Sequence, residues 1–182
     1  KISQYSLSGN FMKNYTIELD MRSIMYNPDD EQLYVNCYDG NIYMISDLDK
    51  GSYKLVYSKL YKNEQASLAF GPKGKYLYCL ENGVLTKYDF ATGTVEERFN
   101  GIFSGEEITS GNASVAVSKK YMITFNADKQ VFYLYDKKGK LKETLSFSKG
   151  DYGFSLSYAN GHIFVAEDGD YGMGHWYGYE HK

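Results

Sequence analysis

The sequence predicts an all-β protein of the β-propeller class, made of about four blades of four antiparallel strands. Short apolar segments recur every 41 to 45 residues, with equivalent strand centres at Val35, Tyr78, Ile123 and Phe164, and this period is typical of a four-stranded blade. The 182 residues include 20 Tyr, 18 Gly and only 2 Pro, a composition that suits pleated strands joined by tight turns. No window shows the apolar spacing of a helix over three turns.

Each complete blade is expected to contain four strands joined by tight turns. Asp39-Gly40 and Asn82-Gly83 are hairpin signals, because both residues of each pair tolerate positive φ. We expect three blades, at 23–58, 67–100 and 113–148. Their strands are expected at 23–26, 33–37, 42–46 and 53–57; at 67–70, 76–80, 84–89 and 95–99; and at 114–117, 121–125, 131–135 and 141–147.

The two ends of the chain each match half a blade. Residues 2–17 match a hairpin of third and fourth strands, and residues 153–168 match one of first and second strands. We therefore expect one propeller domain, 1–182, with a closing blade made of 153–182 plus 1–18. Pairing of residues 2–7 with the strand at 162–167 would remove exposed sheet edges. The alternative is that the chain is an excerpt of a larger propeller, in which HWYGY (175–179) forms the third strand of the last blade.

The turn-and-strand run at 70–78 (FGPKGKYLY), followed by 88–93 (YDFATG), resembles the repeats of YVTN and quinoprotein-type β-propellers. Residues 27–35 repeat the first half of this pattern, and Tyr135-Asp136 with Gly139 repeats the second half. The resemblance implies a propeller fold for most of the chain. It implies no particular activity, because this fold carries lactonases, dehydrogenases, lyases and plain binding modules.

Composition argues against several classes of function. The formal net charge of −3 and the pI near 5.6 argue against nucleic-acid binding, which usually needs a basic face. No apolar run approaches the ~18 residues needed to span a membrane. Two Cys cannot form a disulfide framework and are read as unpaired strand residues. None of the three His lies near a plausible nucleophile motif, so no catalytic residue and no cofactor are expected.

The segment that departs from the repeat is the Gly-aromatic stretch at 169–182, which holds the only Trp. Aromatic faces with polar tips can stack on a sugar ring, a cation or a partner's side chain. The alternative is that these aromatics only pack against the closing blade. The expected ligand-binding residues are Tyr171, His175, Trp176, Tyr177 and Tyr179, together with Arg22 from a loop on the same face.

Charges sort unequally between the two loop faces of the predicted blades. The acidic face, formed by the turns between second and third strands and by the connections between blades, carries Asp39, Glu64, Glu81, Glu106, Glu107, Asp128, Asp151, Asp168 and Asp170. The lysine-rich face, formed by the other turns, carries Lys50, Lys73, Lys75, Lys119, Lys120, Lys137, Lys138 and Lys140. An acidic face favours a cationic ligand or a basic peptide, although charged loops also serve solubility alone.

Carboxylates at equivalent turns also allow a metal site, with a divalent cation such as Ca²⁺ as the alternative cofactor. The candidate ligands are Asp168, Asp170, Asp39, Glu81 and Asp128. The competing interpretation is that Asp168-Gly169 is simply another hairpin turn.

The function expected from the sequence is a non-enzymatic module that binds a protein, a peptide or a small cationic or carbohydrate ligand. Binding would use the acidic face and the segment 169–182. The alternative is a metal-dependent lactonase, hydrolase or lyase with carboxylates at the mouth of the channel. Self-association is expected if the ring is not closed. An extracytoplasmic location, periplasmic or secreted, is favoured over a cytoplasmic one, but the sequence does not establish the compartment.

Overall fold

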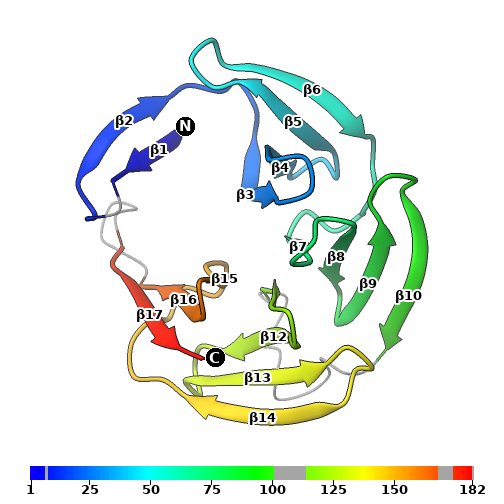
Figure 1. The fold of residues 1–182 in the computed structure, drawn as a ribbon, viewed down its shortest axis with the longest axis vertical. Coiled ribbons are helices and arrows are strands. Elements are labelled where there is room, and N and C mark those ends of the chain that lie inside the picture. The colour runs from blue at the N-terminus through cyan, green and yellow to red at the C-terminus, as the bar shows by residue number, and fades with distance from the viewer. Residues whose placement is uncertain (7, 101–113, 168–173, 182) are drawn as a thin grey trace. The chain divides into compact units, whose positions relative to one another are not determined.

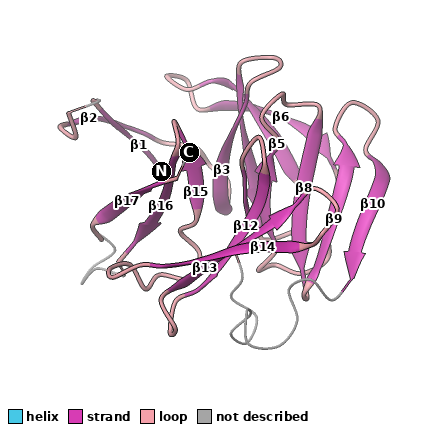
Figure 2. Cartoon of the chain, turned by 60° about the horizontal axis from the view of Figure 1, so that its bottom comes forward, coloured by secondary structure: helices cyan, strands magenta, loops and turns pink. Residues whose placement is uncertain are grey.

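A computed structural model describes residues 1–6, 8–100, 114–167 and 174–181 (Figure 1). The chain divides into two compact units, residues 1–64 and 65–182. Every regular element in the described residues is a β-strand (Figure 2), which confirms the all-β prediction. Accordingly, no helix in the described part of the chain is long and apolar enough to cross a membrane.

Unit 1 contains a hairpin followed by one four-stranded blade. The hairpin pairs β1 with β2, and the blade has the antiparallel order β3-β4-β5-β6. Both were expected from the sequence, to within a few residues at each strand end. The bounds are β1 Ile2–Tyr5, β2 Phe11–Tyr15, β3 Met21–Asn27, β4 Gln32–Cys37, β5 Ile42–Asp47 and β6 Ser52–Tyr57.

Unit 2 contains two four-stranded blades and a three-stranded one. The strand orders are β7-β8-β9-β10, β11-β12-β13-β14 and β15-β16-β17, all antiparallel. The bounds are β7 Ser67–Phe70, β8 Tyr76–Glu81, β9 Val84–Asp89, β10 Thr94–Asn100, β11 Ala116–Val117, β12 Tyr121–Asn126, β13 Val131–Asp136, β14 Leu141–Ser146, β15 Ser157–Ala159, β16 His162–Ala166 and β17 Trp176–Glu180. The inner strand β11 contacts both β7 and β15, the inner strands of the blades before and after its own, as in a propeller.

The last blade corrects the prediction of how the chain ends pair. The position next to β16, which the closure prediction assigned to residues 2–7, is occupied by β17. The alternative, in which HWYGY provides the third strand, is therefore the one observed, because Trp176–Glu180 forms that strand. Residues 2–5 pair with β2, as expected, in a sheet of their own.

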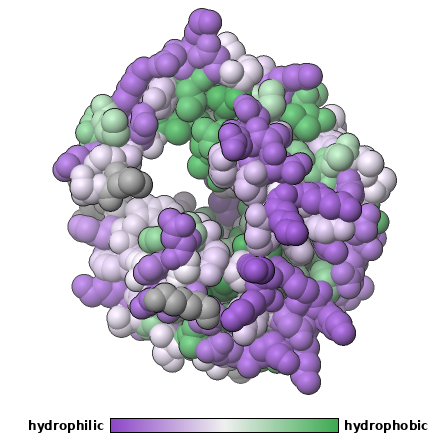
Figure 3. Space-filling view, in the orientation of Figure 1, coloured by the Kyte–Doolittle hydropathy of each residue, from purple (hydrophilic) through white to green (hydrophobic). Residues whose placement is uncertain are grey.

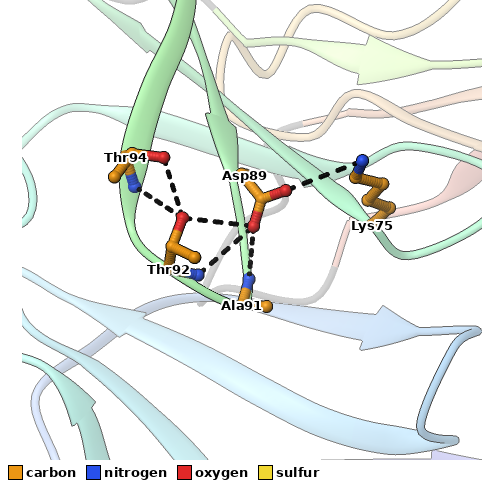
Figure 4. Close-up of polar contacts among 5 residues, drawn as sticks. All are labelled: Lys75, Asp89, Ala91, Thr92 and Thr94. Atoms are coloured by element: carbon orange, nitrogen blue, oxygen red, sulfur yellow. Dashed lines mark hydrogen bonds and ion pairs between the residues drawn. The ribbon is translucent and has the colours of Figure 1, made fainter.

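An aspartate at the end of the third strand organises the following turn in every four-stranded blade. The Asp89 carboxylate accepts hydrogen bonds from the Ala91 and Thr92 amides at 3.1 and 3.2 Å, and Lys75 approaches it at 3.8 Å (Figure 4). Asp47 and Asp136 accept equivalent backbone bonds, from Lys50 and from Lys138 and Lys140. These amide bonds hold the pKa values of Asp47 and Asp136 below their usual range. The repeat seen in the sequence is therefore also a repeat of turn chemistry.

The core of unit 1 joins the hairpin to the blade. Val35, Cys37 and Ile45 are buried together with Ile17, and Ile2 of β1 packs against them. The far end of the hairpin lies outside this core.

In unit 2 each apolar cluster lies between two consecutive blades. The first cluster contains Tyr78, Leu80 and Leu85 of the β7–β10 blade. They pack against Val115, which directly precedes β11, and against Met122 of β12 in the next blade. The second joins residues of the β11–β14 blade, among them Ile123, Phe125 and Phe132, to Leu156, Ile163 and Val165 of the last blade. We name as the forward face of a blade the face that packs against the following blade. Stability therefore comes from blade-to-blade packing, as in other repeat proteins.

The two cysteines are free and buried, one in each unit, as expected. Burial raises the pKa of Cys37 to about 11 and also raises that of Cys79. We expect neither thiol to react with dithionitrobenzoate at about pH 8 in the folded protein, and both to react in denaturant. The Cys37→Ala variant keeps only the Cys79 thiol and reports the opening of unit 2. The Cys79→Ala variant keeps only the Cys37 thiol and reports the opening of unit 1. Rapid labelling of either thiol without denaturant would contradict the burial described here.

Candidate interaction site on strand β17

Strand β17 is the edge of its sheet. It pairs with β16 from His162↔Glu180 to Ala166↔Trp176, and the Glu167 amide donates to the His175 carbonyl at 2.9 Å. The other blades have a fourth strand at the corresponding place, namely β6, β10 and β14. Within the described residues, β17 has no strand partner on its outer side.

Alternate residues of β17 face opposite sides of the sheet, which separates the predicted aromatic residues into two groups. Tyr179 faces the core, where its ring lies 5.6 Å from that of Phe132 and 5.7 Å from that of Phe147. Its hydroxyl accepts a 2.8 Å bond from the Lys149 amide and donates one of 2.8 Å to the Lys149 carbonyl. Tyr179 therefore anchors the strand. For this residue the structure agrees with the alternative interpretation, in which the aromatic side chain serves packing rather than ligand binding.

Tyr177 lies on the same side as Tyr179, near the start of the strand. A hydrogen bond with Glu167 raises the pKa of Tyr177, and His175 lies 3.8 Å from the same carboxylate. The Lys149 ammonium lies 5.3 Å from the Tyr177 ring. His175, Tyr177 and Glu167 thus form a polar group at one end of β17.

Trp176 lies on the opposite side, the forward face of this blade, and is 60% exposed. Next to it, Phe164 covers Gly178 so closely that a Cβ on the glycine would lie 2.9 Å from the ring. The His162 ring lies beside Phe164 at a tilt, with ring centres 6.0 Å apart. This face therefore presents aromatic surface to solvent.

The strand registers show what Trp176 corresponds to in the other blades of unit 2. Three cross-strand pairs occupy equivalent places near the end of the second strand and the start of the third: Leu80↔Leu85, Phe125↔Phe132 and Ala166↔Trp176. Leu85 and Phe132 are 0% and 1% exposed, because the following blade covers them. Trp176, at the equivalent place in the last blade of unit 2, is 60% exposed.

The other predicted site residues belong to other parts of the chain. Tyr171, Asp168 and Asp170 lie outside the described residues. Arg22 belongs to unit 1, at a β-bulge at the start of β3. Asp39 holds its own turn, accepting bonds from the Asn41 amide at 3.0 Å and the Asn41 side chain at 2.7 Å.

The metal site remains a prediction. Across residues 1–6, 8–100, 114–167 and 174–181, no three His, Cys, Asp or Glu side chains are grouped so that they could hold a metal ion. Thermal-shift measurements with Ca²⁺ or Mn²⁺ test the predicted metal site, including the version that uses Asp168 and Asp170.

The lysine-rich face is well defined in unit 2. Hydrophilic side chains cover the β11–β12 and β13–β14 turns (Figure 3), where Lys119, Lys120, Lys138 and Lys140 lie. Lys137, from the same turn, differs from these because it is half-buried. Its ammonium donates to the Ser118 and Tyr121 carbonyls at 2.9 and 3.2 Å and lies 5.3 Å from the Tyr78 ring.

Burial, together with the nearby charge of Lys87, lowers the pKa of Lys137 to about 8. Because the unfolded chain keeps the ordinary value near 10.5, it binds more protons than the folded protein between these two pH values. The free energy of unfolding should therefore rise from about pH 8 to 10.5, by at most about 3 kcal/mol. The two bonds to carbonyls favour the charged form and reduce this gain.

Urea unfolding at several pH values tests the role of Lys137 when wild type is compared with Lys137→Met. We expect the pH-dependent rise in the wild type and its loss in Lys137→Met. The exposed neighbour supplies the control, because Lys138→Met should keep the rise. A rise of equal size in all three proteins would show that another group is responsible.

No protein-family model matches the sequence, and no curated protein matches it. Among solved structures, the chain is similar to U3-55K, with a TM-score of 0.53 and 12% identity, over 83% of this chain and 46% of that one. A structure of RRP9 WD40 repeats gives a TM-score of 0.52 and 13% identity over the same shares, and apo AztD from Citrobacter koseri gives 0.47 and 12% over 79% and 40%. This chain spans less than half the length of each. Likeness at such identity shows the fold alone, and the fold shown is the β-propeller.

Proposed function

We propose that this protein is a protein-interaction module of the propeller type, whose partner binds the forward face and the open edge of the β15–β17 blade. The observation that carries the proposal is Trp176, 60% exposed at a position where Leu85 and Phe132 are buried. A large apolar side chain left open on a packing surface is typical of an interface, and Trp is enriched among the residues that dominate binding energy.

The open edge of β17 supports the same proposal. An edge strand presents unpaired amides and carbonyls to which another polypeptide can add a strand. The place of a fourth strand is filled in the other three blades. Backbone pairing along β17 and side-chain contact with Trp176 would then act together, with Glu167 and His175 as a polar rim.

Site-specific photo-crosslinking in cells tests this proposal. With p-benzoylphenylalanine in place of Trp176, we expect a discrete adduct with a polypeptide. The matched control carries the same group in place of Leu141, a 41% exposed residue of β14, and should give none. Absence of an adduct at 176, or equal adducts at both positions, would overturn the proposal. For a purified partner, Trp176→Ala should weaken binding by at least about 30-fold.

A further inference from the structure

The hydrogen bonds of β17 show which of its residues direct their backbone toward the open edge. The Glu167 amide donates to the His175 carbonyl at 2.9 Å, and the His181 amide donates to the Gly161 carbonyl at 2.6 Å. In an antiparallel pair, residues that bond to the neighbouring strand alternate with residues whose backbone groups point away from it. The backbone groups that point to the open edge are therefore those of the even-numbered residues of β17, namely Trp176, Gly178 and Glu180.

The side chains of these same residues share the forward face. Trp176 and Glu180 are exposed, and Gly178 between them has no side chain. The Phe164 ring covers Gly178, since a Cβ on the glycine would lie 2.9 Å from it. A polypeptide paired with β17 would therefore meet an aromatic surface, made by Trp176 and Phe164, and then a carboxylate.

The two complete blades of unit 2 show what a fourth strand places opposite the counterparts of Trp176. Strand β10, antiparallel to β9, places Phe99 opposite Leu85, and Phe99 is 6% exposed. Strand β14, antiparallel to β13, places Leu145 opposite Phe132, where it packs on the same core. A strand added to β17 in the same direction is therefore expected to place a large apolar side chain opposite Trp176.

The same two blades show which charge suits the other end of the strand. Asp89 and Asp136 are the counterparts of Glu180, because each lies four residues after the buried residue that corresponds to Trp176. The Lys75 ammonium lies 3.8 Å from the Asp89 carboxylate. The Lys142 ammonium, which belongs to the fourth strand β14, lies 4.0 Å from that of Asp136. A basic side chain beside Glu180 would repeat this arrangement.

Further carboxylates lie near both ends of β17. Glu167 approaches His175 at 3.8 Å at one end, and Glu143 approaches His181 at 3.2 Å at the other. A nearby ammonium, that of Lys149, lies toward the opposite side of the sheet, 5.3 Å from the Tyr177 ring. Because interfaces are complementary in charge, this distribution favours a basic segment over an acidic one.

We propose that the partner contributes an extended basic segment that pairs antiparallel with β17 as a fourth strand; this inference rests on the proposed function. A Lys or Arg of the segment lies opposite Glu180. Four residues later, an aromatic or large aliphatic side chain lies opposite Trp176. The residue midway between them packs on Phe164 over Gly178. Backbone pairing supplies affinity, and the alternate side chains supply specificity.

A capped synthetic heptapeptide, Thr-Arg-Thr-Val-Thr-Phe-Thr, carries this pattern and probes the edge directly. In the proposed register Arg lies opposite Glu180, Val opposite Gly178 and Phe opposite Trp176. We expect it to bind with Kd below about 1 mM, to shift the Trp176 emission to the blue and to slow amide exchange at Gly178. In the protein alone, the amides of 177 and 179 should exchange slowly and that of Gly178 fast.

Two altered peptides test the register. Moving Phe one residue toward the N-terminus turns its ring to the other side of the sheet, so binding should weaken by at least about 10-fold. Methylation of the Val amide removes a hydrogen bond to β17 and should also weaken binding by at least about 10-fold. The matched control is methylation of the next Thr amide, which points away from β17 and should leave binding unchanged.

A charge exchange tests the basic residue. Wild type should bind the Arg peptide at least about 5-fold more tightly than the peptide with Glu in its place, and Glu180→Lys should reverse this preference. Glu96→Lys, at an exposed position of β10, is the control and should keep the wild-type preference. Reversal also shows that the Glu180→Lys variant is folded.

Four results would overturn the inference. They are no binding of the Arg peptide at about 1 mM, equal binding of the shifted peptide, equal binding of the Arg and Glu peptides, and a Gly178 amide already protected in the protein alone, because the edge is then already paired. Crosslinking separates this inference from the proposed function. An adduct from position 176 to a segment without the basic and apolar pattern would retain the function and refute the basic strand, whereas absence of any adduct refutes both.

Discussion

Phe132→Ala is expected to lower the free energy of unfolding of unit 2 by about 3–5 kcal/mol. Phe132 is 1% exposed and lies in the core between the β11–β14 and β15–β17 blades. Its ring stacks on Phe147 at 4.4 Å and lies 5.6 Å from Tyr179 and 6.2 Å from Phe125. Truncation removes these contacts and leaves a cavity, because three neighbouring rings cannot all collapse into the space.

Urea unfolding, followed by Trp176 emission, measures the effect of Phe132→Ala. In the Cys37→Ala background, faster labelling of Cys79 in the absence of denaturant gives a second measure of unit 2 alone. Phe132→Leu should cost less, about 1 kcal/mol, and remains measurable if the Ala variant does not fold. Leu141→Ala, on the exposed strand β14, should change stability by less than about 0.5 kcal/mol. A loss below about 1.5 kcal/mol for Phe132→Ala would show that the blades do not depend on this core.

The strands could be predicted from the sequence because their signals are local. Strand β9 ends at Asp89 as expected, since alternating apolar residues lead into a turn that the same Asp organises. The turn at Asn82-Gly83 was equally clear, and both residues have positive φ. Such signals depend on residues adjacent in sequence, so the packing of the rest of the chain does not change them.

The pairing of the chain ends could not be predicted in the same way. The hairpin signal at Asp168-Gly169 predicts a turn after the strand at 162–167 but not which segment pairs beside that strand, so the sequence allowed either residues 2–7 or HWYGY there. Both segments can form a strand, and only long-range packing distinguishes them. Tyr179, held by Phe132 and by the Lys149 backbone, provides that packing for β17.

Composition indicated the segment that we propose as the site, but it did not separate the two faces of strand β17. Period-two alternation along 176–180 carried the missing information, since it places Trp176 on the side opposite Tyr177 and Tyr179. Comparing the ladder positions of Leu85 and Phe132 with Trp176 would have completed the argument. For Lys137 no such signal exists, because nothing in KKGK distinguishes the half-buried lysine from its exposed neighbours.

Gly40→Ala is expected to destabilise unit 1 by about 3 kcal/mol or more, well beyond the usual effect of a turn substitution. Gly40 has φ of +84°, which costs an L-residue about 1 kcal/mol. A Cβ there would also lie 2.4 Å from the Tyr61 carbonyl oxygen. That backbone cannot retreat easily, because the Leu60 amide donates to the Gly40 carbonyl at 3.0 Å and the buried Tyr61 hydroxyl bonds to the Cys37 carbonyl.

Gly9→Ala separates the two contributions in Gly40→Ala. Gly9 has nearly the same φ, +81°, but nothing lies within 4 Å of its would-be Cβ, so its substitution should cost only about 1 kcal/mol. Labelling of Cys37 in the Cys79→Ala background reads the stability of unit 1 for both variants. If Gly40→Ala lowered the free energy of unfolding no more than Gly9→Ala does, the backbone at Leu60–Tyr61 would not be fixed in close contact with the turn at Gly40. A clearly larger loss of stability for Gly40→Ala than for Gly9→Ala would show that glycine is required at position 40 chiefly because the Tyr61 backbone passes so close to it. The sequence alone marks Gly40 only as a hairpin residue.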